Sequence, residues 1–489
     1  METVQILLVL IIFLTLAVLM FFRKIPALLA LPLMAFLIPL VSGVAPLHII
    51  EFVLGKGATK LTEAYTIAIF GSMLSILLQK TGVAERFIKI GAELSGDKPW
   101  TISVIMLIMI ILLFTTLGGL GAIIMVATVV LPILTSVGVG GVTTVGIFLF
   151  GLSIGGIFNV GNWAVYKELG LEVDQVRTFA LIMFAISIII ALVYITISLY
   201  RDGNDINLRG ILFKTVITAI LIAAAYFGFN ALPDQMKDMI ANVTVFAVTA
   251  LKFLIGGGII LVMVTAMIRS FHPMYKNKFF WGAYFTPLVP LLLILLFNIN
   301  FIASFIVGLL FGFITTRKEN SLNTFIRSVL EGGAVVMPAV VLMLGIGMLL
   351  NAVMGPGGDI VKALYPSGWP VLTLLKPVMM AVIPESRWAF ILIFSVAAPL
   401  ALYRGPLNVW GMGYGLAAIL LASGLNAGAI MGILMAVGQI QGISDPTNTQ
   451  NVWLANEMRV DVQKILWNTI PYTWLAALFG IIAAAFLYF

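Results

Sequence analysis

The chain consists mainly of apolar runs of membrane-spanning length, separated by short polar stretches. A helix needs about 20 apolar residues to cross the hydrocarbon core of a bilayer. The pattern predicts about 16 such segments, at 4–22, 25–43, 61–79, 101–116, 122–137, 142–158, 178–200, 211–229, 243–268, 281–297, 301–314, 334–353, 388–403, 407–423, 427–441 and 465–489. Residues 101–137 and 388–423 could instead form re-entrant helical hairpins. The pattern therefore predicts an all-α polytopic membrane protein with about 14–16 membrane segments.

Two stretches of the chain repeat later in the sequence, in the same order. "VLGKGA" at Val53 resembles "VLEGGA" at Val329, and each precedes an apolar span. "NWAVYKELGLEVDQV" from Asn162 aligns without a gap with "NVWLANEMRVDVQKI" from Asn451. These matches predict two homologous transmembrane repeats, at 1–200 and 281–489, joined by two linking helices at 201–280.

Basic residues follow alternate spans, and their distribution predicts an orientation. They are Arg23, Lys24, Lys80, Arg86, Lys89, Lys98, Arg201, Arg209, Arg269, Lys276, Lys278, Arg317 and Lys318. The positive-inside rule places them in the cytoplasm and the N-terminus outside, in the cytoplasmic (inner) membrane. The two halves then run in opposite directions, an inverted repeat typical of secondary transporters. Lys56 and Lys60 lie on the opposite side in this scheme.

Composition narrows the function further. Hydrophobic residues make up 62% of the chain and charged residues 10%, which fits a lipid bilayer. Without cysteine and with only two histidines, the chain offers no disulfide and no cysteine or histidine metal cluster. It also lacks a complete P-loop, so ATP hydrolysis is not expected. We expect no enzyme, no cofactor beyond Na⁺ or H⁺ as the coupling ion, and no nucleic-acid partner, because cytoplasmic loops account for the net charge of +7.

The two candidate hairpins offer groups for an anion. In "FTTLGGLGA" the hydroxyls of Thr115 and Thr116 and the backbone at Gly118 and Gly119 are candidate donors. In "LYRGPLN" we select Arg404, Gly405 and Asn408, because a buried arginine can hold a carboxylate with two hydrogen bonds. The alternative is a turn between two full spans, with Arg404 reaching a lipid headgroup.

Two polar breaks follow the next spans, at "IFNVGNW" and "GISDPTNTQNVW". Their carboxylate, amide and hydroxyl oxygens suit a coupling cation, and discontinuous helices bind substrate near the bilayer midplane. We assign cation coupling to Asn159, Ser444, Asp445 and Asn448, and substrate binding to Asn162 and Thr447. The alternative is a polar connection, since Asp-Pro-Thr-Asn is a good turn.

Weaker candidates have simpler explanations. Lys252 would be costly if it faced lipid, but the glycines after it favour close helix packing. Glu63 is interpreted as interfacial, and Glu385 and Arg387 as a surface cap.

Two stretches carry a resemblance to known proteins, at Lys56 to Phe87 and Ser444 to Thr469. The layout resembles the ion-transporter superfamily and, within it, the gluconate permease (GntP) family and related citrate and C4-dicarboxylate carriers. Ser444, Asp445 and Asn448 would occupy that family's polar patch. The family's histidine- and proline-rich patch after the first hairpin has no counterpart in "FNVGNW". The resemblance implies uptake of a small organic anion, coupled to H⁺ or Na⁺, by a homodimer.

The sequence thus predicts a secondary active transporter for a small carboxylate, working by alternating access. A Na⁺/H⁺ (cation/proton) antiporter is the alternative, in which Asp445 exchanges cations and Arg404 only pairs with it. A channel and an intramembrane enzyme rank lower, because the inverted repeat favours a carrier and no paired catalytic carboxylates are apparent.

Overall fold

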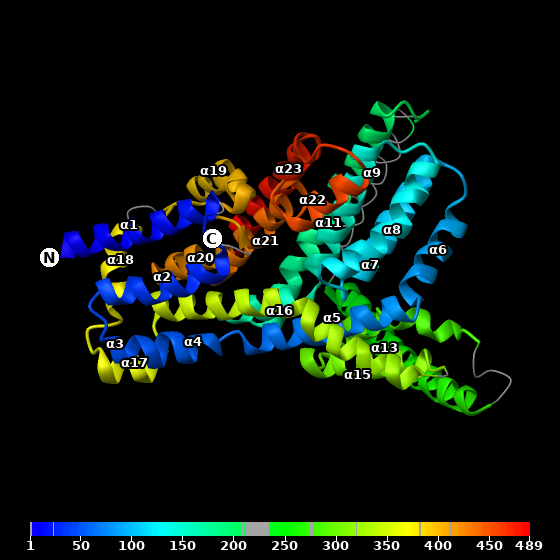
Figure 1. Ribbon diagram of the computed structural model, residues 1–489, viewed down its shortest axis with the longest axis horizontal. Coiled ribbons are helices and arrows are strands. Elements are labelled where there is room, and N and C mark those ends of the chain that lie inside the picture. Colours follow the sequence, from blue (N-terminus) through cyan, green and yellow to red (C-terminus); the bar gives the residue numbers. More distant parts are fainter. Residues whose placement is uncertain are drawn as a thin grey trace.

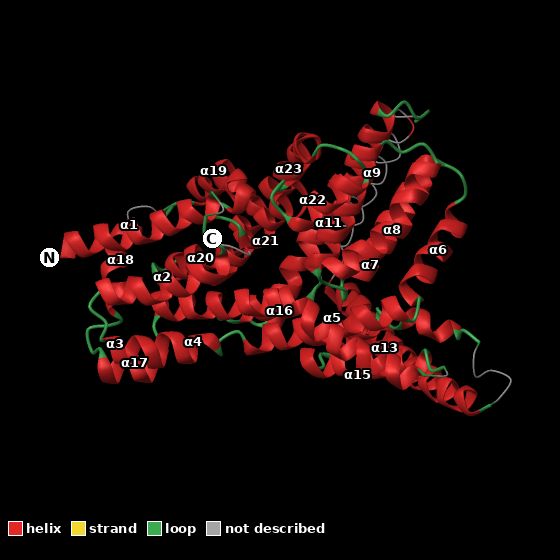
Figure 2. Cartoon of the chain, in the orientation of Figure 1, coloured by secondary structure: helices red, strands yellow, loops and turns green. Residues whose placement is uncertain are grey.

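The computed structural model describes residues 2–22, 24–206, 210, 234–272, 278–318, 320–380, 383–409 and 413–489. Every regular element in these ranges is a helix (Figure 2). Lipid offers no hydrogen-bond partners to the backbone, and a helix satisfies its N–H and C=O groups internally. The prediction of an all-α polytopic protein is confirmed.

The first part of the chain contains one long composite helix and a series of shorter ones (Figure 1). Its elements are α1 (Glu2–Phe21), α2 (Ala27–Val41), α3 (Pro46–His48), the π-helix η1 (Ile49–Gly55), α4 (Lys56–Ala58), α5 (Thr62–Lys80), α6 (Val83–Ser95), α7 (Pro99–Phe114), α8 (Leu120–Ser136), α9 (Gly141–Ile157), α10 (Val160–Lys167) and α11 (Val173–Arg201). The span predicted at 61–79 begins earlier, because α3, η1, α4 and α5 form one apolar run over Pro46–Lys80.

The rest of the chain contains α13 (Asp234–Phe271), the 3-10 helix η2 (Trp281–Phe285), α14 (Val289–Phe297), α15 (Phe301–Thr315), α16 (Ser321–Met354), α17 (Gly358–Leu364), α18 (Pro370–Met380), α19 (Arg387–Ala397), the 3-10 helix η3 (Ala398–Arg404), α20 (Tyr414–Ala422), α21 (Ala427–Ser444), α22 (Thr449–Glu457) and α23 (Val462–Tyr488). The segment predicted at 281–297 divides into η2 and α14, since Pro287 and Pro290 lack backbone donors. The span predicted at 211–229 lies outside the described residues.

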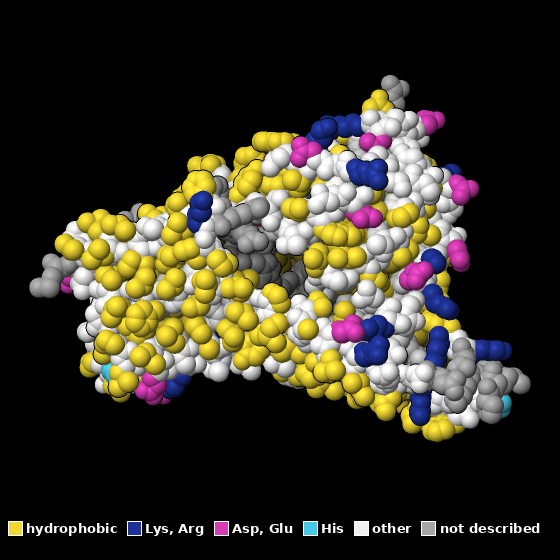
Figure 3. Space-filling model, viewed as in Figure 1, with side chains coloured by type: hydrophobic (Ala, Val, Ile, Leu, Met, Phe, Trp, Pro, Cys, Tyr) yellow, Lys and Arg dark blue, Asp and Glu magenta, His cyan; other side chains and the backbone are white. Residues whose placement is uncertain are grey.

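Fewer helices than predicted could cross a bilayer unaided. Among the described residues, seven are long and apolar enough, or eight if the bent pair α9–α10 is one span. Several predicted segments, such as α7 and α8, are apolar helices of only 10–17 residues. Hydrophobic side chains cover much of the face seen in Figure 3, and an apolar 18-residue window of α13 has no buried residue, as suits contact with lipid.

Helices α5 and α16 lie side by side through the middle of the molecule (Figure 1). Glycine allows the backbone of α16 to touch α4 and α5: a Cβ added to Gly57 in α4 would lie 2.7 Å from the Cα of Met348, and one added to Gly332 would lie 2.5 Å from the Cα of Met73 in α5. Close backbone approach at small residues stabilises helix pairs in membranes. Both helices line the site described below.

The turn between α7 and α8 is inside the protein. Thr115, Thr116 and Leu117 are each at most 3% exposed. At 1.5 Å per residue, helices of 16 and 17 residues reach about 25 Å, less than the hydrocarbon core of about 30 Å. The geometry matches a re-entrant hairpin better than two full spans.

Candidate functional site

Two helices are interrupted inside the bundle. Helix α9 ends at Ile157, and α10 continues after a bend of 47°. Helix α21 ends at Ser444, and α22 begins at Thr449 after Pro446, which cannot donate a backbone hydrogen bond. Interrupted helices leave backbone N–H and C=O groups free for ligands at membrane depth.

The segments that follow the two breaks take the same backbone course. In the gapless sequence match, Asn159 corresponds to Asn448, and each is the N-cap of the short helix that follows. Gly170 corresponds to Arg459, and both have a positive φ, of 88° and 52°. Glu172 corresponds to Asp461, and both are N-caps of long helices. The repeat is therefore structural over these segments, while the division into halves at 1–200 and 281–489 stays a prediction.

Helices α9 and α21 cross next to their breaks. Ser153 Oγ in α9 donates to Gln439 Oε1 in α21 at 3.0 Å. Ser153 corresponds to Gly442 in the match, and a Cβ added to Gly442 would lie 2.7 Å from Ser153 Oγ. Equivalent positions thus face each other, which places the two breaks together in space.

A first cavity, the hairpin cavity, lies on one side of the α9–α10 break. Its volume is about 400 Å³, and α5, the α7–α8 tip, α9, α10, α15 and α16 line it. Thr116, Gly118 and Gly119 contribute from the tip, and Asn159 and Asn162 from the break. Apolar side chains such as Phe305 form much of the remaining wall.

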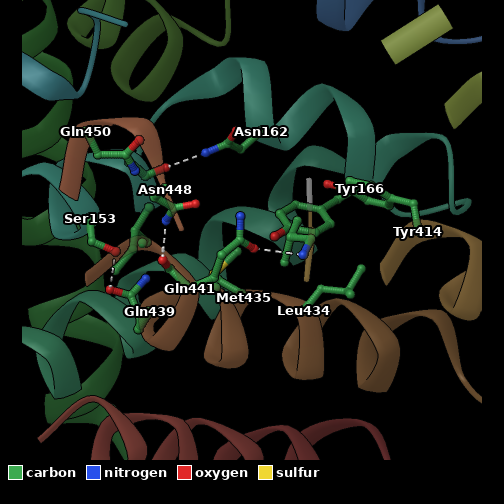
Figure 4. A pocket seen from close by; sticks show the side chains of 15 residues that line it. Ser153, Asn162, Tyr166, Tyr414, Leu434, Met435, Gln439, Gln441, Asn448 and Gln450 are labelled. Atoms are coloured by element: carbon green, nitrogen blue, oxygen red, sulfur yellow. Dashed lines mark hydrogen bonds between the residues drawn. The ribbon is translucent and has the colours of Figure 1, made fainter. Parts of the chain in front are cut away.

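A second cavity, the crossing cavity, lies between α9, α10, α20, α21 and α22 (Figure 4). Its volume is about 170 Å³, enough for several waters or one small solute. Its polar side chains are Ser153, Asn162, Tyr166, Tyr414, Gln439, Gln441, Asn448 and Gln450. Gly156 and Asn162 line both cavities and so form the wall between them. Asn162 Nδ2 donates to the Gly156 carbonyl at 2.9 Å and holds that wall together.

Three helices begin at this pair of cavities. Gly119, the N-cap of α8, lines the hairpin cavity, Asn159 at the start of α10 lines the same cavity, and Asn448 at the start of α22 lines the crossing cavity. Helix N-termini carry partial positive charge and free N–H donors. Within the described part of the chain, every side chain lining either cavity is uncharged. The arrangement therefore favours an anion or a polar group.

The second break holds a buried carboxylate. Asp445 is 0% exposed. Its Oδ1 accepts from the N–H of Thr447 at 2.9 Å and from the Thr447 hydroxyl at 2.7 Å, and its Oδ2 accepts from Asn408 Nδ2 at 3.5 Å. Asn448 Nδ2 donates to the Gln441 carbonyl at 2.5 Å, which ties α22 back to α21.

The structure brings most of the predicted site residues into these surroundings. Thr116, Gly118, Gly119, Asn159, Asn162 and Asn448 line a cavity, and Asn408, Asp445 and Thr447 form the hydrogen-bonded group at the second break. Their assignment as binding residues stays a prediction.

Four predicted residues remain, and the structure describes the contacts of three of them. The Thr115 hydroxyl donates to the carbonyl of Leu112. Ser444 Oγ lies 2.8 Å from the hydroxyls of Thr469 and Thr473 in α23, so it joins α21 to α23. Gly405 packs its backbone against Leu400. Arg404 ends η3, and its side chain lies outside the described part of the structure.

The sequence analysis missed several polar residues that line the crossing cavity, namely Ser153, Tyr166, Tyr414, Gln439, Gln441 and Gln450. A signal existed for two of them. Gln439 and Gln441 interrupt the apolar run of α21, and polar side chains inside a membrane segment commonly face the bundle interior. The others are separated in sequence and meet only through the crossing of α9 and α21.

Comparison with known proteins shows the fold. No protein-family model and no curated protein matches the chain. Among solved structures, the chain is similar to the YdaH transporter of Alcanivorax borkumensis, whose crystal structure is described as having an unusual topology. The TM-score is 0.54 at 12% sequence identity, over 94% of this chain and 96% of that one.

Fold and spans together define a multi-pass helical membrane protein with the fold of a membrane transporter. At 12% identity the likeness extends to the fold and not to a substrate. The predicted resemblance to the gluconate permeases is supported at the level of a transporter fold, and the assignment to that family stays a prediction.

Proposed function

We propose that the chain is a secondary active transporter that moves a small organic anion across the membrane, coupled to H⁺ or Na⁺. The observation that supports this most is the meeting of three helix N-termini at two adjoining cavities with uncharged lining among the described residues. Partial positive charge from helix ends stabilises an anion without a fixed counter-ion that would prevent its release.

In this proposal the substrate carboxylate lies at the start of α10 or α22. Gln439, Gln441 and Gln450 offer both donors and acceptors to the remainder of the molecule. The wall of Gly156 and Asn162 separates the two cavities. Alternating access requires that the substrate passes this wall while one side stays closed, and movement of α10 relative to α5 would accomplish that.

The coupling cation is proposed to bind at the breaks, near Asp445, Asn448, Ser444 and Asn159. Carboxylate and amide oxygens suit Na⁺, and a buried carboxylate also suits a proton. The alternative, an antiporter, uses Asp445 alone, and the experiment below distinguishes them. We also propose a homodimer in the cytoplasmic membrane with its N-terminus outside.

Thermal stability of the purified protein tests the proposal. The ligands are monocarboxylates, dicarboxylates and hydroxy acids, each with and without Na⁺. A ligand at 100 times its Kd stabilises the folded state by about 2.7 kcal/mol, which raises Tm. We expect a rise with one class of acid. A rise with Na⁺ or pH alone would instead support the antiporter.

A matched pair of variants assigns the ligand to the cavities. Asn162→Asp puts a negative charge into the wall between them and should abolish the rise in Tm. Asn426→Asp is the control, because Asn426 caps α21 through its Oδ1 at 2.7 Å from the Gly428 nitrogen, a role that aspartate also fills. If the two variants showed equal changes in Tm, the anion would not bind at these cavities.

A further inference from the structure

The two cavities of the site differ in the chemistry of their walls. The crossing cavity, of about 170 Å³, is lined mainly by amides and hydroxyls (Figure 4). The hairpin cavity, of about 400 Å³, has four polar side chains among its described lining residues, Ser72, Thr116, Asn159 and Asn162. Its other described lining residues are glycines or apolar. The two cavities therefore suit different parts of a substrate.

Helix α16 supplies a long apolar wall to the hairpin cavity. Its lining residues recur at helical spacing and so share one face of the helix, namely Val335, Val336, Ala339, Leu342 and Met343. From Val335 to Met343 this face is about 12 Å long. Over that length its side chains offer van der Waals contact and no hydrogen bond to a ligand.

The hairpin tip brings a helix start to this wall. Helix α8 has Gly119 as its N-cap and no side-chain capping bond, so the N–H groups of its first turn lack intrahelical partners. A Cβ added to Gly119 would lie 3.4 Å from Cγ1 of Val335, which places the start of α8 beside the apolar face of α16. Donors for an anion and a surface for an apolar body thus lie next to each other.

Ser72 of α5 adds a hydroxyl at the same place. It lines the hairpin cavity and is 4% exposed, and its Oγ has no hydrogen-bond partner among the described residues. The adjoining Gly71 would place a Cβ 3.4 Å from the carbonyl oxygen of Thr116, so this turn of α5 lies against the hairpin tip. A buried hydroxyl without a partner is unfavourable, and an acceptor on a ligand would remove that cost.

The other three polar side chains each already use one group within the protein. Thr116 Oγ donates to the Pro287 carbonyl at 2.9 Å. Asn159 Oδ1 accepts from the Gly161 N–H at 3.1 Å, and Asn162 Nδ2 donates within the wall between the cavities. Few groups are left for the hydroxyls of a sugar acid, and a buried hydroxyl without a partner disfavours binding. The hairpin cavity therefore favours a ligand with one polar end.

We propose that the substrate is a monocarboxylate with an apolar body. Its carboxylate lies near the starts of α8 and α10 and accepts a hydrogen bond from Ser72, and its body lies along α16 in the hairpin cavity. The polar crossing cavity receives the carboxylate, and any polar group beside it, when the substrate passes the wall. The proposal rests on the proposed transport function and names the class of its substrate. Gluconate and C4-dicarboxylates, which the sequence resemblance implies, fit these walls poorly.

The first test measures apparent Kd values from the concentration dependence of Tm for the purified wild type. The ligands are butyrate, pentanoate, hexanoate, octanoate, gluconate, succinate and the neutral hexanamide. We expect the affinity to rise about fourfold per added methylene group until the cavity is full, and hexanamide to bind weakly. Tighter binding of gluconate or succinate than of hexanoate would overturn the substrate class and leave the transporter in place. No response to any acid would refute the transporter itself.

The second test changes the length of the cavity. Met343 is 4% exposed and lines it, whereas Met337 of the same helix is 49% exposed. Met343→Ala should improve the affinity for octanoate relative to hexanoate about tenfold, and Met337→Ala should leave this ratio unchanged. If Met343→Ala does not fold, Ala68→Leu narrows the cavity from α5 and should shift the preference to shorter acids. An unchanged ratio in the folded variant would contradict the placement of the body.

The third test concerns the carboxylate end. Ser72→Ala should weaken all the monocarboxylates about tenfold and leave the dependence on chain length unchanged. Ser75→Ala is the matched control, because Ser75 lies in the same helix, is 2% exposed and also has an Oγ without a partner among the described residues. Equal affinities of the two variants would show that Ser72 does not bind the carboxylate.

Discussion

The two breaks are followed by segments with the same backbone course, but they differ in chemistry. Gly156, in the last turn of α9 before the first break, corresponds to Asp445, the first residue after α21. Gly156 borders both cavities, and a Cβ there would meet no atom within 4 Å. Asp445 is fully buried and held by Thr447 and Asn408. Equivalent positions thus supply an open, uncharged wall at one break and a fixed buried carboxylate at the other.

This difference suggests a division of roles. A substrate anion needs positive potential and space, which the first break offers through the N-terminus of α10. A cation needs oxygen ligands and a compensating charge, which the second break offers through Asp445. Substitutions that give one break the charge of the other should therefore have the largest effects on ligand binding.

The largest effect on anion affinity is expected for Gly156→Asp, which places a carboxylate beside the first break, as Asp445 does at the second. Two like charges about 5 Å apart repel by about 3 kcal/mol at an effective dielectric constant of 20, which weakens anion affinity about 100-fold. Titration calorimetry with the acid that raises Tm measures this change. Gly156→Ala is the control and should bind nearly as well as the wild type, because the added methyl group meets open space.

Removal of the Asp445 carboxylate at the second break should lower the stability of the fold. Asp445→Ala removes the acceptor of the Thr447 N–H and hydroxyl, and one of the two acceptors of Asn408 Nδ2, which should lower the free energy of unfolding by about 2–3 kcal/mol. Asp445→Asn keeps the size and one acceptor and should cost less, yet it should also abolish the effect of Na⁺ or pH on ligand binding. Denaturation in detergent and ligand titrations measure the two effects. If Na⁺ and pH affected ligand binding in Asp445→Asn as in the wild type, the role of Asp445 would be only to stabilise the turn.

A smaller difference is expected between the N-caps of the short helices. Asn159 Oδ1 accepts from the Gly161 nitrogen at 3.1 Å, so Asn159→Ala should lower stability by about 1 kcal/mol. Asn448 makes no such cap bond and instead joins α22 to α21. Asn448→Ala should therefore speed hydrogen exchange across α22 while α10 stays protected. Equal effects on both helices would show that the breaks are more alike than their contacts indicate.

The smallest effect concerns pH. Because the folded-state pKa of Glu168 is raised, the protonated group contributes stability at low pH, and this contribution is lost as pH rises from about 4.5 through the folded pKa. The Tm of the wild type should therefore fall relative to that of Glu168→Gln as pH rises. Glu331→Gln serves as the reference, because Glu331 pairs with Lys80, the last residue of α5, at 2.8 Å. A Tm difference that does not vary with pH would argue against a buried, titrating Glu168.

The sequence predicted the parts of the fold that apolar length and local chemistry determine. Asn159 and Pro446 signalled the breaks, because caps and prolines act through their own backbone. Helix α18 and the π-helix η1 were missed, because their residues are not arranged as a full apolar span. Among the described residues seven helices are long and apolar enough to cross a bilayer alone, and apolar composition did not separate these from a short hairpin helix such as α7.

The site was predictable only where its residues are neighbours in sequence. Asp445 and Thr447 contact each other within one turn, and the sequence identified both. Ser153 and Gln439 meet across a separation of 286 residues, which no local pattern indicates. Lys60 conflicted with the predicted orientation, and the structure gives it partners inside the protein: its Nζ donates to Asn351 Oδ1 at 3.1 Å, and it interacts electrostatically with Glu168.

Charge movement by the reconstituted protein tests the central claim most directly. Small carboxylates are added to proteoliposomes on a solid-supported membrane without an ion gradient, and the current is recorded for the wild type and Gly156→Asp. The account predicts a transient current with one class of acid, which saturates with concentration and is lost in Gly156→Asp. Currents evoked by Na⁺ or pH jumps but by no carboxylate would contradict it.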